Sequence, residues 1–297
     1  MSQQQQGAGA LPNLAPDSPD ESLAGQRADF ARQQAAVPDD VTVRERTLGA
    51  RPALELRVAG TASAGTLLFL HGGGYVLGSP RTHAALTATL ARRTGTTAVS
   101  LDYRLAPEHP FPAPVEDALA AYRAVLDSGV KAEDLVLAGD SAGGGLVLAT
   151  LLSVREAGLP QPAAAAVFSP WVDLTLSGAS MRGKEGIDPI FTKDSLRVFA
   201  DRYLGDGDRS VGLASPVFAD LHGLPPLLVQ VGSHEVLLDD AVRLAARAGA
   251  DDVNVTLEIW AELSHVFQDR FETLKEADRA LDRAARFLTD HLGANGR

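Results

Sequence analysis

Short apolar runs alternate along this chain with longer stretches in which apolar residues recur at helical spacing. The runs predict β-strands at residues 66–70, 96–101, 135–138, 164–168, 227–231 and 253–260. The helical spacing predicts helices at residues 82–93, 114–126, 142–156, 237–248 and 272–292. Apolar strands separated by helices are typical of a mostly parallel sheet covered on both faces. We therefore expect an α/β fold, with residues 41–48 and 53–58 as an antiparallel edge pair that turns near Gly49 and Ala50.

Two segments do not follow this alternation. Residues 1–36 are rich in Gln, Pro and acidic side chains at their start, and residues 174 to about 215 hold a Gly- and charge-rich loop and one expected helix at 194–203. Long insertions between the strands of an α/β sheet are usually functional. We expect residues 1–36 to form a disordered start followed by cap helices, and residues 177–215 to form a cap insertion. Residues 37–176 and 216–297 then form the α/β domain.

Composition and charge exclude several classes of protein. Among 297 residues, 27 Lys and Arg face 38 Asp and Glu, so the net charge is -11 and nucleic acids or anionic lipids are poor partners. The absence of cysteine excludes disulfides, thiolate metal sites and a cysteine nucleophile. The chain starts with no visible targeting signal, and its apolar runs are shorter than the roughly 20 residues of a membrane span. We expect a soluble, cytoplasmic protein.

The sequence Gly139-Asp140-Ser141-Ala142-Gly143 lies between an expected strand and an expected helix. A G-x-S-x-G sequence in that position is typical of a nucleophile elbow, in which small residues permit a sharp turn that exposes the Ser hydroxyl. Ser141 is therefore a candidate nucleophile. The alternative is a Gly-rich turn with an N-capping Ser.

The sequence His71-Gly72-Gly73-Gly74-Tyr75 follows the strand expected at 66–70. Successive glycines allow backbone N–H groups to face one point, as a tetrahedral oxyanion requires. We predict the N–H groups of Gly73 and Gly74 as donors, with that of Ala142 at a helix N-terminus as a third. A phosphate-binding loop is the alternative, but the Gly-Lys-Ser/Thr that ends a P-loop is absent. We expect His71 to hold this loop by a hydrogen bond rather than to bind a metal or act as a base.

A serine nucleophile requires a base, and His265 follows the last expected strand by a short loop. This position agrees with the chain order Ser, acid, His of the elbow-containing fold. We expect His83 and His291 to lie on helix surfaces and His222 in a loop.

The acid of such a triad is expected after the strand at 227–231. Glu235 is the first carboxylate beyond that turn, whereas Asp239 and Asp240 fall within the following helix. We predict Glu235, with Asp239 or Asp240 as the alternatives. An acid in this role orients the imidazole and stabilises the imidazolium.

With these residues identified, the chain resembles the bacterial carboxylesterases of the hormone-sensitive lipase family. The resemblance rests on residues 71–75, on residues 139–144 and on a third stretch, Asp102-Tyr103-Arg104-Leu105-Ala106-Pro107-Glu108-His109-Pro110-Phe111-Pro112-Ala113, and it covers about residues 35–292. Most members have Asp-Pro-Leu at the acid, whereas this chain has Glu235-Val236-Leu237 and is similar to a subset with Glu there.

The resemblance implies an α/β-hydrolase fold with an eight-stranded, mostly parallel sheet and a helical cap. It also implies a Ser141, Glu235, His265 triad that hydrolyses short- to medium-chain acyl esters without a cofactor or metal, in a protein that can form homodimers. A lactone hydrolase, a natural-product deacetylase or an acyltransferase would use the same residues. Dehydratases and hormone receptors of this family have lost the nucleophile or the His, and both are present here.

The substrate is the least determined feature of the sequence. Four aromatic residues are candidate apolar walls of the substrate pocket, with ordinary core or cap packing as the alternative: Tyr75, Trp171, Phe191 and Phe199. Because only 5% of the residues are aromatic and the cap segments lack a long apolar stretch, we expect short acyl groups.

Overall fold

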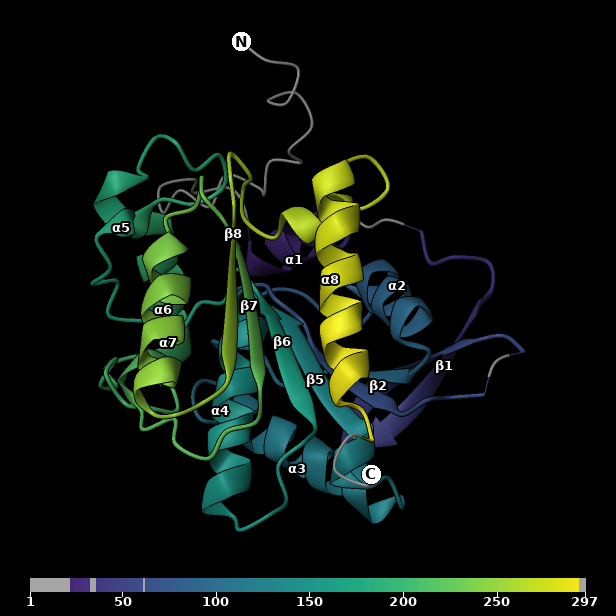
Figure 1. Cartoon of the computed structure of the whole chain (residues 1–297). Coiled ribbons are helices and arrows are strands. Elements are labelled where there is room, and N and C mark those ends of the chain that lie inside the picture. The colour runs from purple at the N-terminus through teal and green to yellow at the C-terminus, as the bar shows by residue number, and fades with distance from the viewer. Residues whose placement is uncertain (1–21, 33–35, 61, 294–297) are drawn as a thin grey trace.

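An eight-stranded sheet forms the centre of the computed structural model, which describes residues 22–32, 36–60 and 62–293 (Figure 1). The strands are β1 (Val41–Leu48), β2 (Arg51–Val58), β3 (Thr66–Leu70), β4 (Thr97–Leu101), β5 (Leu135–Asp140), β6 (Ala164–Phe168), β7 (Leu227–Gly232) and β8 (Val255–Trp260). Their order across the sheet is β1-β2-β4-β3-β5-β6-β7-β8. Each strand expected from the sequence is present, with ends that differ by at most two residues.

The sheet is antiparallel at one edge and parallel elsewhere. β1 pairs antiparallel with β2, and β2 with β4, while every other neighbouring pair is parallel. The expected turn between β1 and β2 is present: Gly49 and Ala50 both have positive φ, 57° and 69°. Because the carboxyl ends of parallel strands meet at one edge, the loops after β3, β5, β6, β7 and β8 lie together.

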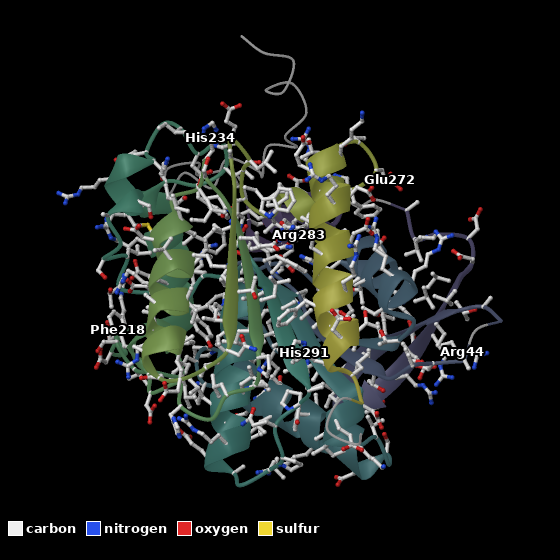
Figure 2. The ribbon with its side chains drawn as sticks, in the orientation of Figure 1. Arg44, Phe218, His234, Glu272, Arg283 and His291 are labelled. Atoms are coloured by element: carbon white, nitrogen blue, oxygen red, sulfur yellow. The ribbon has the colours of Figure 1, made fainter. Side chains whose placement is uncertain are left out.

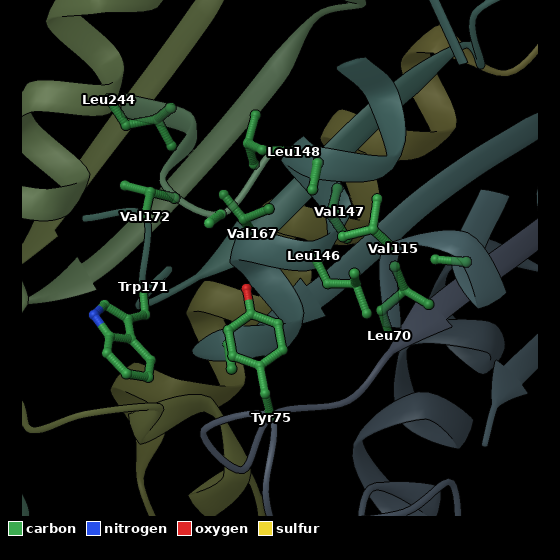
Figure 3. Packing of buried hydrophobic residues seen from close by; sticks show 14 of the residues in the cluster. Leu70, Tyr75, Val115, Leu146, Val147, Leu148, Val167, Trp171, Val172 and Leu244 are labelled. Carbon is green, nitrogen blue, oxygen red and sulfur yellow. The ribbon is translucent and has the colours of Figure 1, made fainter. Parts of the chain in front are cut away.

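Helices cover both faces of the sheet. The first face carries α3 (Ala113–Asp127), α4 (Ala142–Glu156) and α7 (Leu238–Ala250), and the second carries α2 (Ala84–Thr94) and α8 (Lys275–His291), as Figure 1 shows. The central strands point alternate side chains into the two layers, so Leu68 and Leu70 join the first and Leu67 and Phe69 the second. Figure 3 shows the first layer, where Leu146 and Val147 of α4 pack between Leu70 and Val167.

Shorter elements lie beyond the carboxyl edge of the sheet. They are α1 (Leu23–Ala31), α5 (Ser180–Gly183) and α6 (Lys193–Leu204), with the 3-10 turns η3 (Pro216–Phe218) and η4 (Phe267–Arg270) nearby and η2 (Ala132–Asp134) before β5. The predicted helix at 194–203 is therefore α6. Residues 1–21 of the predicted N-terminal segment lie outside the described residues, and the domain boundaries stay a prediction.

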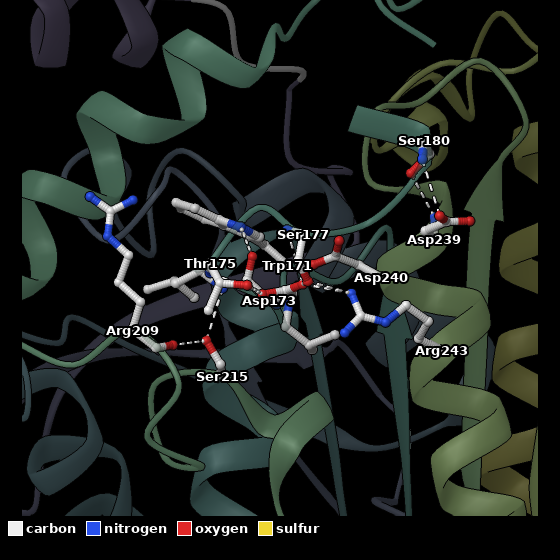
Figure 4. A network of polar contacts seen from close by, with 12 residues as sticks. Trp171, Asp173, Thr175, Ser177, Ser180, Arg209, Ser215, Asp239, Asp240 and Arg243 are labelled. Carbon is white, nitrogen blue, oxygen red and sulfur yellow. Dashed lines mark hydrogen bonds and ion pairs between the residues drawn. The ribbon is translucent and has the colours of Figure 1, made fainter. Parts of the chain in front are cut away.

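The segment after β6 is held to α7 by a polar network around two buried carboxyl groups, Asp173 and Asp240 (Figure 4). Arg243 Nη1 donates to Asp173 Oδ2 at 2.6 Å and to Ser177 Oγ at 3.2 Å. Asp240 Oδ2 accepts the N–H groups of Val172 and Asp173, each at 2.9 Å, and Ser180 N–H donates to Asp239 Oδ2 at 3.0 Å. These contacts fix the start of the segment relative to the sheet.

In Figure 2 Arg44 of edge strand β1 lies at one rim of the molecule, and Phe218, which is 43% exposed, lies at the opposite rim. Among the described residues, no helix combines the length and apolar character that crossing a membrane requires.

Candidate active site

Ser141 occupies a sharp turn between β5 and α4. Its φ of 53° and ψ of -123° are strained for a residue with a side chain, as expected of a nucleophile elbow. The turn has no room for larger neighbours: a Cβ on Gly143 would lie 2.1 Å from Leu70 O, and one on Gly139 would lie 2.6 Å from the same oxygen. The predicted need for small residues two positions before and after the Ser therefore has a direct steric cause.

The glycine loop after β3 is held from several sides. Gly72 N–H donates to Asp140 Oδ1 at 3.0 Å, and His71 Nδ1 lies 2.8 Å from Gly72 O. Tyr103, from the third stretch of the family resemblance, donates its hydroxyl to His71 O at 2.6 Å. The hydrogen bond expected of His71 is thus present. Burial lowers the pKa of His71 to about 3, so its ring is neutral and Nδ1–H donates to the carbonyl.

The amides predicted as oxyanion donors lie beside this elbow. Among the residues that the structure describes, the N–H groups of Gly73 and Gly74 donate to no acceptor. Ala142 is the first residue of α4, where backbone N–H groups have no partner within the helix. Both glycines have positive φ, 116° and 63°, which orients the chain in a way that a larger residue would resist.

His265 and Glu235 meet at the same edge of the sheet. His265 Nδ1 lies 2.9 Å from Glu235 Oε2, and both side chains are buried. Burial by itself lowers the pKa of His265, but the hydrogen bond to Glu235 and its charge outweigh this effect and raise that pKa above its ordinary value. Because Glu235 contacts Nδ1, the second ring nitrogen of His265, Nε2, does not take part in this hydrogen bond.

The two alternative carboxylates have other partners. Asp239 accepts from Ser180, and Asp240 accepts from the backbone of Val172 and Asp173. Of the three acids weighed from the sequence, Glu235 is the one that contacts His265.

Ser169, which belongs to none of the motifs recognised in the sequence, connects the loops of the site. Its hydroxyl donates to Glu235 Oε1 at 2.7 Å and accepts from Val266 N–H at 3.1 Å. The elbow lies next to it, because Ser141 N–H donates to Phe168 O at 2.8 Å. The signal available in the sequence was a polar residue directly after a buried strand, at the edge where the other site residues gather.

One sequence prediction is wrong. His83, expected on a helix surface, is 5% exposed and its Nε2 lies 3.4 Å from Asp140 Oδ2. The expectation failed because the residue stands just before α2, where packing against β3 and α1 covers it: its ring centroid lies 6.3 Å from that of Phe69 and 6.0 Å from that of Phe30.

The four aromatic candidates are buried near these loops. Tyr75 stacks on Tyr203 with centroids 3.8 Å apart, and Figure 3 shows it beside Trp171 in the core. Phe191 meets the His265 ring edge-on at 4.9 Å. Phe199 of α6 packs on Gly74, since a Cβ there would lie 2.5 Å from its ring. Their contact with substrate stays a prediction.

Comparison with known proteins agrees with this arrangement. A protein-family model described as the alpha/beta hydrolase fold matches residues 67–269. The chain belongs to the alpha/beta hydrolase family. The predicted fold of this α/β hydrolase is thereby confirmed.

Three similar proteins with names are an acetyl-hydrolase and two esterases. This α/β hydrolase is 47% identical to an acetyl-hydrolase of Streptomyces hygroscopicus over 77% of its own length and 76% of the relative's. It is 38% identical to an esterase of Acinetobacter venetianus, covering 85% of this chain and 84% of that one. A crystal structure of an esterase from the bacterial hormone-sensitive lipase family superposes with a TM-score of 0.90 at 42% identity, over 94% of each chain. The resemblance found in the sequence is supported by that structure.

Proposed function

We propose that this α/β hydrolase is a serine carboxylesterase in which Ser141 is the nucleophile, His265 the general base and Glu235 the acid. Carboxylic ester hydrolysis itself is the reaction class of the protein, since its fold family and its named esterase relatives agree. The observation that carries the residue assignment is the 2.9 Å contact of Glu235 with His265 at the sheet edge where Ser141 occupies its strained elbow.

In the first half of the proposed reaction, the Ser141 hydroxyl attacks the ester carbonyl carbon and its proton passes to His265 Nε2. The carbonyl oxygen becomes an oxyanion that accepts hydrogen bonds from the amides of Gly73, Gly74 and Ala142. When the tetrahedral intermediate collapses, the C–O bond to the alcohol breaks and His265 protonates the leaving oxygen. An acyl-enzyme on Ser141 remains.

In the second half, water attacks the acyl carbon and gives a proton to His265. The second oxyanion uses the same amides, and its collapse returns that proton to Ser141 and releases the carboxylic acid. Throughout, Glu235 holds Nδ1–H of His265 and stabilises the imidazolium that forms twice in each cycle.

We assign short acyl groups to the substrate. Two aromatic rings of the segment after β6 contact residues of the proposed active site. Phe191 packs on His265 and Phe199 on Gly74, so the two rings limit the space beside the nucleophile. The name of the Streptomyces relative, an acetyl-hydrolase, agrees with a short acyl chain.

The nucleophile is tested by covalent labelling. We expect a fluorophosphonate probe to label the wild-type protein at Ser141, as located by peptide mass spectrometry, and Ser141→Ala to abolish both labelling and turnover of nitrophenyl acetate. Labelling at another residue, or more than a few per cent of wild-type turnover in the variant, would show that Ser141 is not the nucleophile.

The acyl preference is tested with nitrophenyl esters of increasing chain length. We expect kcat/KM to be highest for short acyl groups and to fall beyond about twelve carbons, and we expect Phe199→Ala to move the optimum to longer chains. A wild-type preference for longer chains contradicts the assignment. Product analysis with an added alcohol distinguishes hydrolysis from acyl transfer.

A further inference from the structure

A second group of titratable side chains lies behind the nucleophile and is not used by the proposed triad. Asp140 and His83 form a pair with Nε2 3.4 Å from Oδ2, and their side chains are 4% and 5% exposed. The other ring nitrogen of His83, Nδ1, lies 2.7 Å from Thr82 Oγ1. The pair joins the residue next to Ser141 to the residue that precedes α2.

The same carboxylate holds the glycine loop. Asp140 Oδ1 accepts Gly72 N–H, while His71 fixes the carbonyl of the same residue, so the residue before the two predicted oxyanion donors is held on both sides. The approach is close, because a Cβ on Gly72 would lie 2.1 Å from Asp140 Oδ2. Any movement of the Asp140 side chain therefore moves the start of the Gly73-Gly74 segment.

A carboxylate in this position also has an electrostatic cost. A negative charge close to a developing oxyanion opposes catalysis, and the opposition is strong where water is excluded. A cation paired with the carboxylate removes most of that cost. Burial by itself lowers the pKa of His83, but the charge of Asp140 and the contact with it reverse this and raise the pKa to about 9, so the ring is cationic at neutral pH.

We propose that Asp140 and His83 are positioning residues for the oxyanion loop: Asp140 fixes Gly72 by its hydrogen bond, and the His83 cation compensates the Asp140 charge while the oxyanion forms. This inference rests on the proposed ester hydrolysis. Two further titratable groups face His83, namely His71, whose ring stacks on it at 5.5 Å, and Asp269 of η4. His71 is neutral, and among the described residues Asp140, at 3.4 Å, is the carboxylate within ion-pair distance of His83, so Asp140 is the charge that His83 balances.

The test compares Asp140→Asn, His83→Phe and the double variant in the full-length protein. Asp140→Asn keeps an oxygen for Gly72 N–H and removes the charge, so we expect a loss of severalfold in kcat. His83→Phe leaves the carboxylate uncompensated, so we expect a loss of about tenfold or more in kcat for nitrophenyl acetate with KM within about twofold. In the double variant the uncompensated charge is gone, so we expect activity above that of His83→Phe alone.

This recovery is the decisive readout, because two purely structural losses would multiply instead. The affinity for a trifluoromethyl ketone, which forms an oxyanion on Ser141, should weaken by the same factor as kcat/KM. Glu55→Gln is the matched control. It removes a buried carboxylate of β2 that pairs with Arg46 of β1 and Arg57 of β2, and we expect turnover within about twofold of wild type.

Thermal unfolding verifies that each variant is folded. If His83→Phe does not fold, His83→Gln, which keeps a neutral donor near Asp140, replaces it with the same expected direction. Folded single variants that match the Glu55→Gln control, or a double variant that loses the product of the single losses, would overturn the proposal. Wild-type protein that neither hydrolyses the ester nor is labelled at Ser141 would instead overturn the proposed function and this inference with it.

Discussion

At the scale of single residues, the site depends on side chains whose protonation and orientation are set by one or two neighbours. His265 is the clearest case. It must be neutral to accept the proton of Ser141, and its contact with Glu235 favours the protonated form.

The raised pKa of His265 predicts the pH dependence of the reaction. Because the base is inactive when protonated, kcat/KM should fall as the pH drops through this pKa, with a midpoint above the ordinary imidazole value of 6.5. In Glu235→Gln burial remains while the charge that raises the pKa is gone, so the midpoint should move to lower pH as the maximal rate drops. Stopped-flow or plate assays between pH 5 and 9 measure both. A rate that does not vary over this range contradicts the role of His265.

Ser169 predicts a second effect at this scale. Its removal in Ser169→Ala takes one donor from Glu235 and leaves the buried Val266 N–H without an acceptor. We expect kcat to fall by about tenfold to a hundredfold, because small displacements of the base are costly, and stability to fall by about 1–3 kcal/mol.

Ser100→Ala is the control for this variant. Ser100 is buried on β4 and, among the described residues, its hydroxyl has no hydrogen-bond partner. The change should leave kcat unaltered. Equal activity of the two variants would show that Ser169 does not position the acid and base.

At the scale of elements, the start of the segment after β6 is held to α7 by contacts of two neighbouring carboxyl groups, Asp173 and Asp240, whose pKa values are shifted in opposite directions (Figure 4). Burial and the charge of Asp173 raise the pKa of Asp240 well above its ordinary value. For Asp173 burial acts in the same direction, but hydrogen bonds from Ser177 and Thr175 and the contact with Arg243 outweigh it and lower the pKa. Folding therefore shifts the pKa values of these two carboxyls in opposite directions.

This difference predicts opposite outcomes for the two amide variants. A group whose pKa is raised on folding contributes stability at low pH that is lost as the pH rises toward the folded pKa. Asp240→Asn removes this loss, so its melting temperature relative to wild type should improve between pH 5 and pH 8. Asp173→Asn should lower the melting temperature at pH 8, because Arg243 loses its ionised partner. Calorimetry in which the melting temperature of Asp240→Asn, relative to wild type, does not rise between pH 5 and pH 8 would contradict the assignment, as would an Asp173→Asn variant as stable as wild type at pH 8.

At the scale of the whole molecule, stability comes from the two layers of apolar side chains on either side of the sheet. Leu68 on central β3 is fully buried, whereas Val43 on edge strand β1 is 38% exposed. We expect Leu68→Ala to lower the free energy of unfolding by about 2–5 kcal/mol and Val43→Ala by about 0.5 kcal/mol or less, measured by urea denaturation. Similar losses for both would mean that the central strand does not hold the core together.

The sequence by itself determined the local elements and the family. Helix α4 begins and ends at the predicted residues, and β1, β3 and β6 do as well, because a buried strand or helix has a local apolar pattern that a turn residue ends. The elbow and the glycine loop were also visible locally, since each requires small residues at adjacent positions. The fold followed from the alternation of strands and helices.

Only the tertiary structure decided which polar side chains meet. Glu235, Asp239 and Asp240 stand within six residues of one another, and the spacing could rank them but not show that Glu235 alone reaches His265. The contacts of Ser169 and His83 come from segments that are distant in the chain. Ser169 forms hydrogen bonds with the loops that hold Glu235 and Val266, and His83 is buried by residues of β3 and α1. The physical reason is that burial and hydrogen bonding at the carboxyl edge depend on which strands are neighbours in the sheet. The spacing of residues along one strand carries no information about that order.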